Sequence, residues 1–224
     1  MDRSEDHQTK RSARTERRRQ QTAREILDAA RRIVISEGSG TFSLGAVARE
    51  LGLTKPAIYH YYKSKEALLM ELVVQEWLVA GAEVEKAVDK TTDGAAAIEA
   101  LMRTFFNRYR RRPDLFSIAW KMITTPDLSG LTDPDDLNRI RPVNNMLYGG
   151  AEARLLADQK QGRFAGTRNP RLFAFNAHMA VVGILNMKAL SDAADDQLLH
   201  NDDDLLDDMC RTFREAARTK GDLP

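Results

Sequence analysis

The chain has 224 residues and a formal net charge of +1, which is enough length for one domain with a good core, or for a small domain joined to a larger one. The near-zero net charge points to no partner, and the single cysteine, Cys210, excludes an intramolecular disulfide and a cysteine-based zinc site. No N-terminal apolar stretch resembles a signal peptide, and the longest uncharged run, Leu172–Met187, is too short and too polar for a membrane span. We therefore expect a soluble, cytoplasmic protein.

Charge is distributed unevenly along the chain. Seven basic residues and one acid, Glu16, lie between Lys10 and Arg24, whereas the segment from Asp192 to Asp208 holds eight aspartates and no lysine or arginine. This asymmetry indicates a nucleic acid or another anionic partner for the N-terminal part. A charge run that is simply solvated is the alternative.

Apolar residues follow helical spacing from the N-terminal part onward, and no strand-like alternation persists. The first stripe consists of Ile26, Leu27, Ala30, Ile33 and Val34, and the glycines of "EGSG" end that helix. Ser43 is placed to cap a second, short helix, and Thr54 a third helix with Pro56 in its first turn. Ser64 caps a fourth helix that runs toward Val88.

Further helices are predicted in the remainder of the chain. They cover Ala95–Arg111, Pro113–Thr124, Asp135–Gln159, Pro170–Leu190 and Asn201–Thr219. The predicted fold class is therefore all-α, with a small helical head and a larger helical body.

The second and third helices are short and joined by a turn containing Gly52, which is the spacing of a helix-turn-helix. The third helix begins with Lys55, and Lys63 and Lys65 flank the start of the fourth, although lysine is unfavourable at the positive end of a helix. Two helix starts that combine free N–H groups with lysine predict paired anion sites, such as DNA phosphates would fill. Lysines that extend into water are the alternative.

The stretch "FSLGAVARELGLTKPAIYHYYKSKEALL" closely resembles the helix-turn-helix of the TetR family of bacterial transcriptional regulators, over about Ala23 to Leu72. The family pattern is met by Ser43, Val47, Ala48, Gly52, Leu53, Thr54, Pro56, Ile58, Tyr59, Tyr61, Tyr62, Lys65 and Leu68. Two departures are Leu51, which replaces the usual small residue before the turn glycine, and a longer basic N-terminal extension. The resemblance implies a flexible basic arm at residues 1–20, a helix-turn-helix DNA-binding domain at 21–66 and a ligand-binding and dimerisation domain at 67–224.

The resemblance also implies roles at the DNA. The third helix would lie in the major groove, with Lys55, Pro56, Ala57 and Tyr61 nearest the base edges. Tyr59 and Lys65 would hold backbone phosphates, and the hydroxyl groups of Thr54 and Ser43 could donate to others. His60 is either a phosphate donor or an exposed helix residue.

For the body, the resemblance implies a homodimer formed by the last two helices, to which Leu172–Met187 is suited by its small residues Ala177, Ala180 and Gly183. A buried helix of a monomer is the alternative. A pocket for a small-molecule effector of unknown identity would be lined by Phe105, Phe106, Tyr109, Trp120, Met122, Tyr148, Phe173 and His178, although residues of these types are more often part of the core than ligand contacts. Effector binding would release the DNA, which favours a repressor over an activator; no cofactor is implied.

Other classes of protein have weaker support in the sequence. An enzyme is disfavoured because the chain lacks a glycine-rich phosphate loop, a Gly-x-Ser-x-Gly turn and a His-Glu-x-x-His pair. The aspartates of "DAADDQLLHNDDDLLDD", with His200, could bind a divalent cation, but they lack the spacing of a calcium loop and helix capping accounts for half of them. A module that binds a partner other than DNA is the third possibility.

Overall fold

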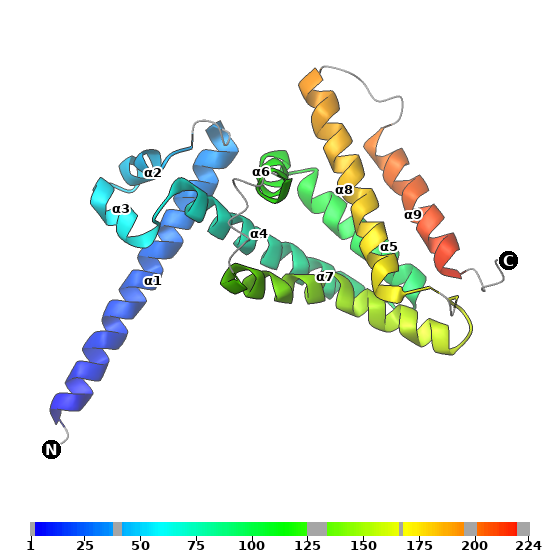
Figure 1. The fold of residues 1–224 in the computed structure, drawn as a ribbon, viewed down its shortest axis with the longest axis horizontal. Coiled ribbons are helices and arrows are strands. Elements are labelled where there is room, and N and C mark those ends of the chain that lie inside the picture. The colour runs from blue at the N-terminus through cyan, green and yellow to red at the C-terminus, as the bar shows by residue number, and fades with distance from the viewer. Residues whose placement is uncertain (1–2, 38–41, 125–133, 166–167, 195–200, 219–224) are drawn as a thin grey trace. The chain divides into compact units, whose positions relative to one another are not determined.

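The computed structural model describes residues 3–37, 42–124, 134–165, 168–194 and 201–218, and within these ranges the regular structure is α-helical (Figure 1). The prediction of an all-α fold is confirmed. The chain divides into two compact units, Met1–Val73 and Val74–Pro224, which we call the head and the body. The division falls inside a helix, seven residues beyond the boundary expected from the sequence.

The head contains α1 (Arg3–Glu37), α2 (Leu44–Glu50), α3 (Lys55–Tyr61) and the first turns of α4 (Lys65–Val88). Helix α1 begins far ahead of the apolar stripe, so the structure gives helical turns to the segment for which the sequence analysis expected a flexible arm. Two local effects favour this. Arginine, glutamine and glutamate are good helix formers, and side-chain pairs four residues apart join Glu16 to Gln20 and Gln21 to Glu25.

Every helix of the head contributes to its core. Ile26 and Val34 of α1, Val47 of α2, Ile58 of α3 and Leu68 of α4 are all fully buried. The turn between α2 and α3 depends on Gly52, whose φ of 64° lies in the left-handed region that side chains other than glycine adopt at a cost. Gly52 therefore permits the tight turn that connects α2 to α3.

The body contains the remainder of α4 together with α5 (Gly94–Tyr109), α6 (Pro113–Thr124), α7 (Pro134–Lys160), α8 (Pro170–Ala194) and α9 (Asp202–Arg218). Helix α5 packs against α7, α8 and α9, and α8 and α9 lie side by side (Figure 1). Large apolar side chains of α5, such as Leu101, Met102 and Phe106, have no exposed surface, so this helix is the centre of the body's core. No described helix has the length and apolar character that crossing a bilayer requires.

The start of α5 is held tightly against α7. A Cβ atom on Gly94 would lie 2.5 Å from a methyl carbon of Leu155, so no larger residue fits without displacing that side chain. Asp158 of α7 accepts a hydrogen bond of 2.7 Å from the Gly94 N–H, and its other oxygen accepts from Arg163. The buried carboxylate is thus satisfied, and the contact sets the register of α5 on α7.

Helix boundaries in the body follow the sequence prediction closely. Helix α6 has the predicted bounds, α5, α7 and α9 differ by one or two residues at each end, and α8 extends to Ala194. Asn169 and Asn201 cap α8 and α9, because their side-chain oxygens accept from Leu172 N and Asp204 N. The glycines of "EGSG" lie outside the described residues.

Candidate nucleic-acid interface and ligand core

The two short helices of the head are each started by a hydroxyl side chain. The Ser43 Oγ accepts a hydrogen bond of 3.1 Å from Ala46 N, and the Thr54 Oγ1 accepts one of 3.4 Å from Ala57 N. A hydroxyl that accepts one bond keeps its own hydrogen. Both residues are exposed, so both can cap a helix and donate to an external acceptor at the same time.

Helix α3 turns a single side chain fully inward. Ile58 is completely buried, whereas Lys55, Pro56, Tyr59 and His60 are exposed, Tyr59 to 45%. Ala57 and Tyr61 are half-buried, and the edge of the Tyr61 ring lies against His60, with ring centroids 5.8 Å apart. Helix α3 therefore presents an aromatic and basic surface that the head itself leaves uncovered.

The start of α3 carries positive charge that favours an anion, but fewer free N–H groups contribute to it than the sequence predicted. No acidic residue lies in the first turn of α2 or α3. Pro56 has no N–H, however, and the Ala57 N–H is bonded to Thr54, so the expected cluster of free N–H groups is not formed in α3. What remains there is the exposed Lys55 and the positive end of a short helix.

The start of α4 is arranged differently. Ser64 caps it through a 3.1 Å bond from Ala67 N, and Glu66 provides an acid in the first turn. The Lys65 ammonium lies 5.9 Å from the centroid of the Phe42 ring, a cation–π distance, and Lys65 is half-buried. Its position is therefore defined by the head and is not that of an unconstrained surface lysine.

Arg49 was not predicted as a site residue. It lies exposed in the last turn of α2, one turn before Gly52. A basic residue at the end of the first short helix, close to the turn, was the available signal. Arg14, Arg17, Arg18 and Arg19 of α1 are exposed too, so the basic bias of the N-terminal segment is surface charge.

In the body, most residues expected to line a pocket lie in its interior. Phe106 is 0% exposed and Tyr109 1%, and Phe105, Tyr148, Phe173 and His178 are buried as well. Trp120 is partly buried against the same core. Met122 lies in α6, but its side chain is outside the described residues. The alternative for these residues was a place in the core, and six of the eight are buried in the body.

Several of these rings form a continuous series of contacts. The His178 ring lies edge-on to Phe105 with centroids 4.2 Å apart, Phe105 contacts Tyr109 at 4.7 Å, and Phe116 follows at 5.7 Å. The Tyr148 hydroxyl is 2.5 Å from the Nδ1 of His178. Burial lowers the pKa of His178 to about 4, and burial raises the pKa of Tyr109 to about 12. Both groups are therefore neutral near pH 7.

A buried ion-pair network joins α4 to α5. Arg108 bonds Glu76 and Glu83, with both N–O distances 2.6 Å, and Arg112 lies 3.6 Å from Glu76. The side chains of Arg108 and Glu76 are only 6% and 5% exposed. Burial lowers the pKa of Arg108, but the hydrogen bonds to the two glutamates outweigh it, so the net shift is upward. The guanidinium therefore keeps its charge, which is balanced by the two glutamates.

The aspartates at the start of α9 have local partners. Asp203 pairs at 2.5 Å with Arg110, the C-cap of α5, Asp207 pairs at 2.6 Å with Arg103 of α5, and Asp202 lies 3.2 Å from Lys188 of α8. No metal-binding group of three His, Cys, Asp or Glu occurs among the described residues; Asp195, Asp196 and His200 lie outside them. Helix capping and ion pairs account for the acidic run of α9 without a cation.

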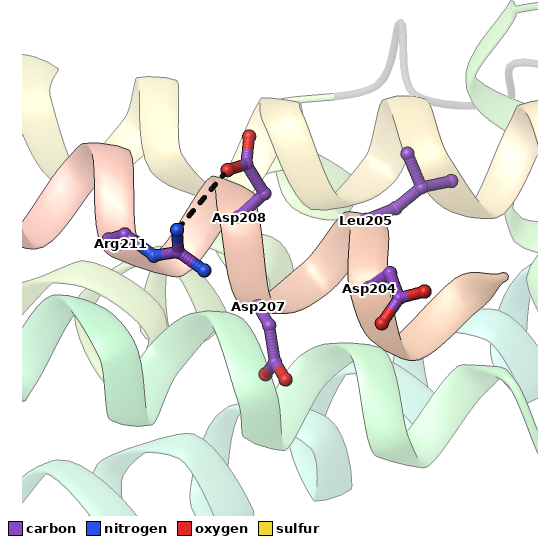
Figure 2. A pocket seen from close by; sticks show the side chains of 5 residues that line it. All are labelled: Asp204, Leu205, Asp207, Asp208 and Arg211. Atoms are coloured by element: carbon purple, nitrogen blue, oxygen red, sulfur yellow. Dashed lines mark ion pairs between the residues drawn. The ribbon is translucent and has the colours of Figure 1, made fainter. Parts of the chain in front are cut away.

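A hollow of about 460 Å³ lies over the outer face of α9 (Figure 2). Its lining is mostly charged, and Arg211 and Asp208 pair across it at 4.0 Å. Cys210, on the other side of the helix, is buried, and burial raises the pKa of its thiol to about 11. The exposed face of α9 is thus polar, and the Cys210 thiol on its other side is covered.

Helix α8, by contrast, has an exposed apolar stripe. Leu172, Phe175 and Met187 are 55%, 41% and 49% exposed, and Gly183 lies on the same side with no atom near its Cβ direction. Leu172 and Phe175 also border a groove of about 380 Å³ between α7 and α8. Ala177, expected to let a partner approach, instead faces the body's own core and is fully buried.

Comparison with known proteins finds sequence matches to transcriptional regulators and solved structures with a similar fold. The family model "Bacterial regulatory proteins, tetR family" matches residues 26–72. An HTH-type transcriptional regulator of Mycobacterium tuberculosis is 27% identical over 114 residues, which are 51% of this chain and 55% of the relative. The HTH-type transcriptional repressor DrrR1 of Streptomyces coeruleorubidus is 28% identical over 153 residues, 62% of this chain and 55% of that protein. The chain thus spans about half the length of the curated relatives it matches.

The fold likeness extends further than the sequence likeness. The FadR regulator of Bacillus subtilis, solved with stearoyl-CoA, superposes with a TM-score of 0.63 over 86% of this chain and 97% of its own, at 14% sequence identity. At that identity the likeness concerns the fold. The family match and the named relatives agree on the head: residues 26–72 carry the helix-turn-helix of the tetR family of bacterial regulatory proteins.

Proposed function

We propose that this chain binds a palindromic DNA operator as a homodimer, represses transcription there, and is released by a small molecule that binds in the body. The observation that carries the DNA-binding part is the surface of α3, which buries only Ile58 and leaves Lys55, Tyr59 and His60 outward with no acid in its first turn. A short helix with this surface fits a major groove. The protein would act in the bacterial cytoplasm, where the DNA is.

Within this proposal the residues of the head divide into two groups. Lys55, Pro56, Ala57 and Tyr61 read base edges, and a lysine donates to guanine O6 and N7. Ser43, Thr54, Tyr59, His60 and Lys65 contact the phosphate backbone and position the head without reading sequence. The exposed arginines of α1 add further phosphate contacts.

A titration against DNA tests the proposal. Labelled duplexes tiling the region upstream of the protein's own gene are titrated by fluorescence anisotropy, and the tightest duplex is then mutated base by base. Lys65→Ala should weaken binding to all these duplexes about equally, whereas Lys55→Ala should relax preference at one base position by about 1–3 kcal/mol. Lys90→Ala is the matched control, because Lys90 is an exposed lysine of the body. Equal losses from Lys55→Ala and Lys65→Ala at every base would contradict the division of roles.

Salt provides a second readout of the same contacts. A dimer that neutralises roughly 6–10 phosphates should lose about 10³–10⁵ in affinity between 50 and 200 mM salt. Lys65→Ala should reduce the slope of log affinity against log salt by about one. A binding constant that hardly changes with salt would argue for a partner other than DNA.

The dimer part of the proposal is supported by the apolar stripe of α8 next to half-buried Leu205, Met209 and Phe213 of α9. Exposed apolar residues in one stripe mark a surface that another protein covers, and a two-fold partner matches a palindrome. Phe175→Glu should shift the protein from dimer to monomer in sedimentation velocity and abolish tight operator binding. Arg211→Glu, on the charged face of α9, is the control and should leave the dimer intact.

The repressor part is supported by the printed name of the Streptomyces relative, a transcriptional repressor. An activator of the same fold is the rival. Transcription in vitro from the protein's own promoter separates the two, since a repressor lowers transcript yield when added and an activator raises it.

The ligand part is supported by the aromatic and partly polar interior around His178 and Phe105. Stearoyl-CoA belongs to the Bacillus FadR, and at 14% identity it does not transfer to this chain. Helix α4 carries residues of both units, so a ligand that binds one arrangement of the body more tightly can shift the head through this helix.

A further inference from the structure

Among the described residues, one buried polar atom of the body stands out. His178 of α8 is 7% exposed, and its Nε2 is buried without a hydrogen-bond partner. Its other ring nitrogen, Nδ1, lies 2.5 Å from the Tyr148 hydroxyl. Buried polar groups in proteins are nearly always bonded, and an unpaired one calls for a specific explanation. His178 thus differs from an ordinary core histidine, because only one of its two ring nitrogens has a hydrogen-bond partner.

Hydrogen counting decides which nitrogen carries the proton. If Nδ1 carried it, Nδ1 would donate to Tyr148, and the hydroxyl hydrogen of Tyr148 would need a second acceptor in the interior. If the hydroxyl donates to Nδ1 instead, its hydrogen is used and the imidazole hydrogen lies on Nε2. The second arrangement leaves fewer unpaired groups. His178 therefore points an N–H donor into the body, held in place by Tyr148.

Within the described part of the chain, no charged side chain bonds this ring. Burial is the cause that lowers the pKa of His178 to about 4, so the ring is neutral at physiological pH. Phe105 packs edge-on against it, and the ring series continues through Tyr109 to Phe116. The cation next to Tyr148 is Arg171, and it is already bonded to Glu152 at 2.7 Å and to Asn145 at 3.2 Å. An ionised group brought here would lose its hydration without gaining a counter-charge.

The Tyr109 hydroxyl and the Nε of Arg108 are also buried without hydrogen bonds, but they have a structural account. Arg108 lies beside the Tyr109 ring, with its guanidinium carbon 6.0 Å from the centroid, and both belong to the region of the Glu76–Arg108–Glu83 ion pairs. The charges of Arg108 and Glu76 influence the pKa of Tyr109. His178 has no such neighbours and so is the better anchor.

We propose that the Nε2–H of His178, oriented by Tyr148, is the hydrogen-bond donor that anchors the body's ligand, and that this ligand is a neutral, largely apolar molecule presenting a carbonyl or ether oxygen. This inference rests on the proposed small-molecule response and narrows it to a chemical class. The apolar part of the ligand packs on the Phe105 side of the ring series, and its oxygen supplies the acceptor that Nε2–H lacks. Charged effectors such as carboxylates are excluded from this anchor.

The tautomer is tested first, without any ligand. The protein labelled with 15N in its histidine rings gives signals from four histidines, and His178→Phe identifies the signals of His178. The expected result is a neutral ring protonated at Nε2 at pH 7. Tyr148→Phe should turn this single form into a mixture of both tautomers. A ring protonated at Nδ1, or a charged ring, would overturn the proposal.

Three matched probes then test the ligand class: 2-acetylnaphthalene, 2-ethylnaphthalene and 2-naphthoate. They share an aromatic body and differ in having a neutral acceptor, no acceptor or a charge. The ketone should bind about 10- to 100-fold more tightly than the hydrocarbon and the carboxylate, and should shift the Nε2–H signal downfield. Equal binding by ketone and hydrocarbon, tightest binding by naphthoate, or no binding by all three would each overturn the assignment.

Variants assign the effect to the donor. His178→Phe should bring the ketone down to the affinity of the hydrocarbon, and His178→Gln, which retains an N–H donor at a similar reach, should restore part of the difference. Asn107→Ala, at an exposed position of α5, is the control and should bind like wild type. Equal affinity of the ketone for His178→Phe and for wild type would show that the anchor lies elsewhere.

These readouts contain no DNA, so they fail separately from the proposed function. If the ketone binds through His178 but does not release an operator duplex, the anchor stands and the ligand-release proposal falls. If an operator is bound and His178 shows no preference for the ketone, the regulator stands and the anchor falls.

Discussion

The head and the body treat their polar side chains in opposite ways. In the head, Lys55, Tyr59 and His60 lie outside on a seven-residue helix that buries only Ile58. In the body, Glu76, Asp158 and His178 are buried; Glu76 pairs with Arg108 of α5, and Asp158 pairs with Arg163 in the turn after α7. The surface proposed to bind DNA is thus built from neighbouring residues of one segment. An interior site is built from residues far apart in the chain.

This contrast is tested most strongly in the body. Arg108→Met removes the 2.6 Å partner of the buried Glu76 carboxylate, and breaking a buried pair from one side should cost about 3–5 kcal/mol of unfolding free energy. Arg103→Met is the matched control on the same helix; its side chain is 39% exposed and should cost less than about 1 kcal/mol. Urea unfolding followed by circular dichroism measures both. Similar costs for the two variants would mean that burial does not distinguish the two networks.

Acid should weaken the body through His178. Its folded-state pKa of about 4 lies below the ordinary value of 6.5, so the unfolded chain takes up a proton between these values and the folded chain does not. Stability is complete above pH 6.5, falls as the pH drops toward 4, and loses up to about 3 kcal/mol over that range.

Carboxylates elsewhere in the chain titrate in part of the same range, so the contribution of His178 is the difference between wild type and His178→Phe. As the pH falls from 6.5 to 4, the unfolding free energy of wild type should drop by up to about 3 kcal/mol more than that of His178→Phe. Parallel curves would show that the imidazole is not held neutral by the fold.

The smallest effects are expected in the head, at the helix caps. Ser43→Ala should cost about 1 kcal/mol, because it removes a 3.1 Å bond to Ala46 N. Thr54→Ala should cost less, because its 3.4 Å bond to Ala57 N is longer. Glycine at either position should cost only a few tenths of a kcal/mol. Thermal unfolding ranks these variants, and a larger loss from Thr54→Ala would reverse the expected order.

The sequence was a good guide to the head because its signals are local. Ser43, Thr54 and Ser64 all cap the helices predicted for them, and Gly52 has the positive φ that the turn needs. The length of α1 was underestimated, since the apolar stripe marks only the part that packs and the N-terminal turns are held by helix propensity.

In the body the helices were predictable and the roles of their side chains were not. The caps Asn169 and Asn201 and the bounds of α6 follow from local residues. The pairing of Tyr148 with His178 joins α7 to α8 across thirty positions, and no local spacing encodes it. The ion pairs of the α9 acids were not predicted, because their partners Arg103 and Arg110 lie about a hundred residues away in the sequence.

Cys210 has a practical consequence. It is the chain's single thiol, and it is buried and held protonated, so it should resist maleimides and other thiol-directed labels while the body is folded. A cysteine introduced at an exposed position of α3, such as His60, would then be the one readily labelled site in each copy. Spin labels attached there would measure the distance between the two α3 helices of the proposed dimer directly, with and without a candidate effector, in solution and without altering the native sulfur.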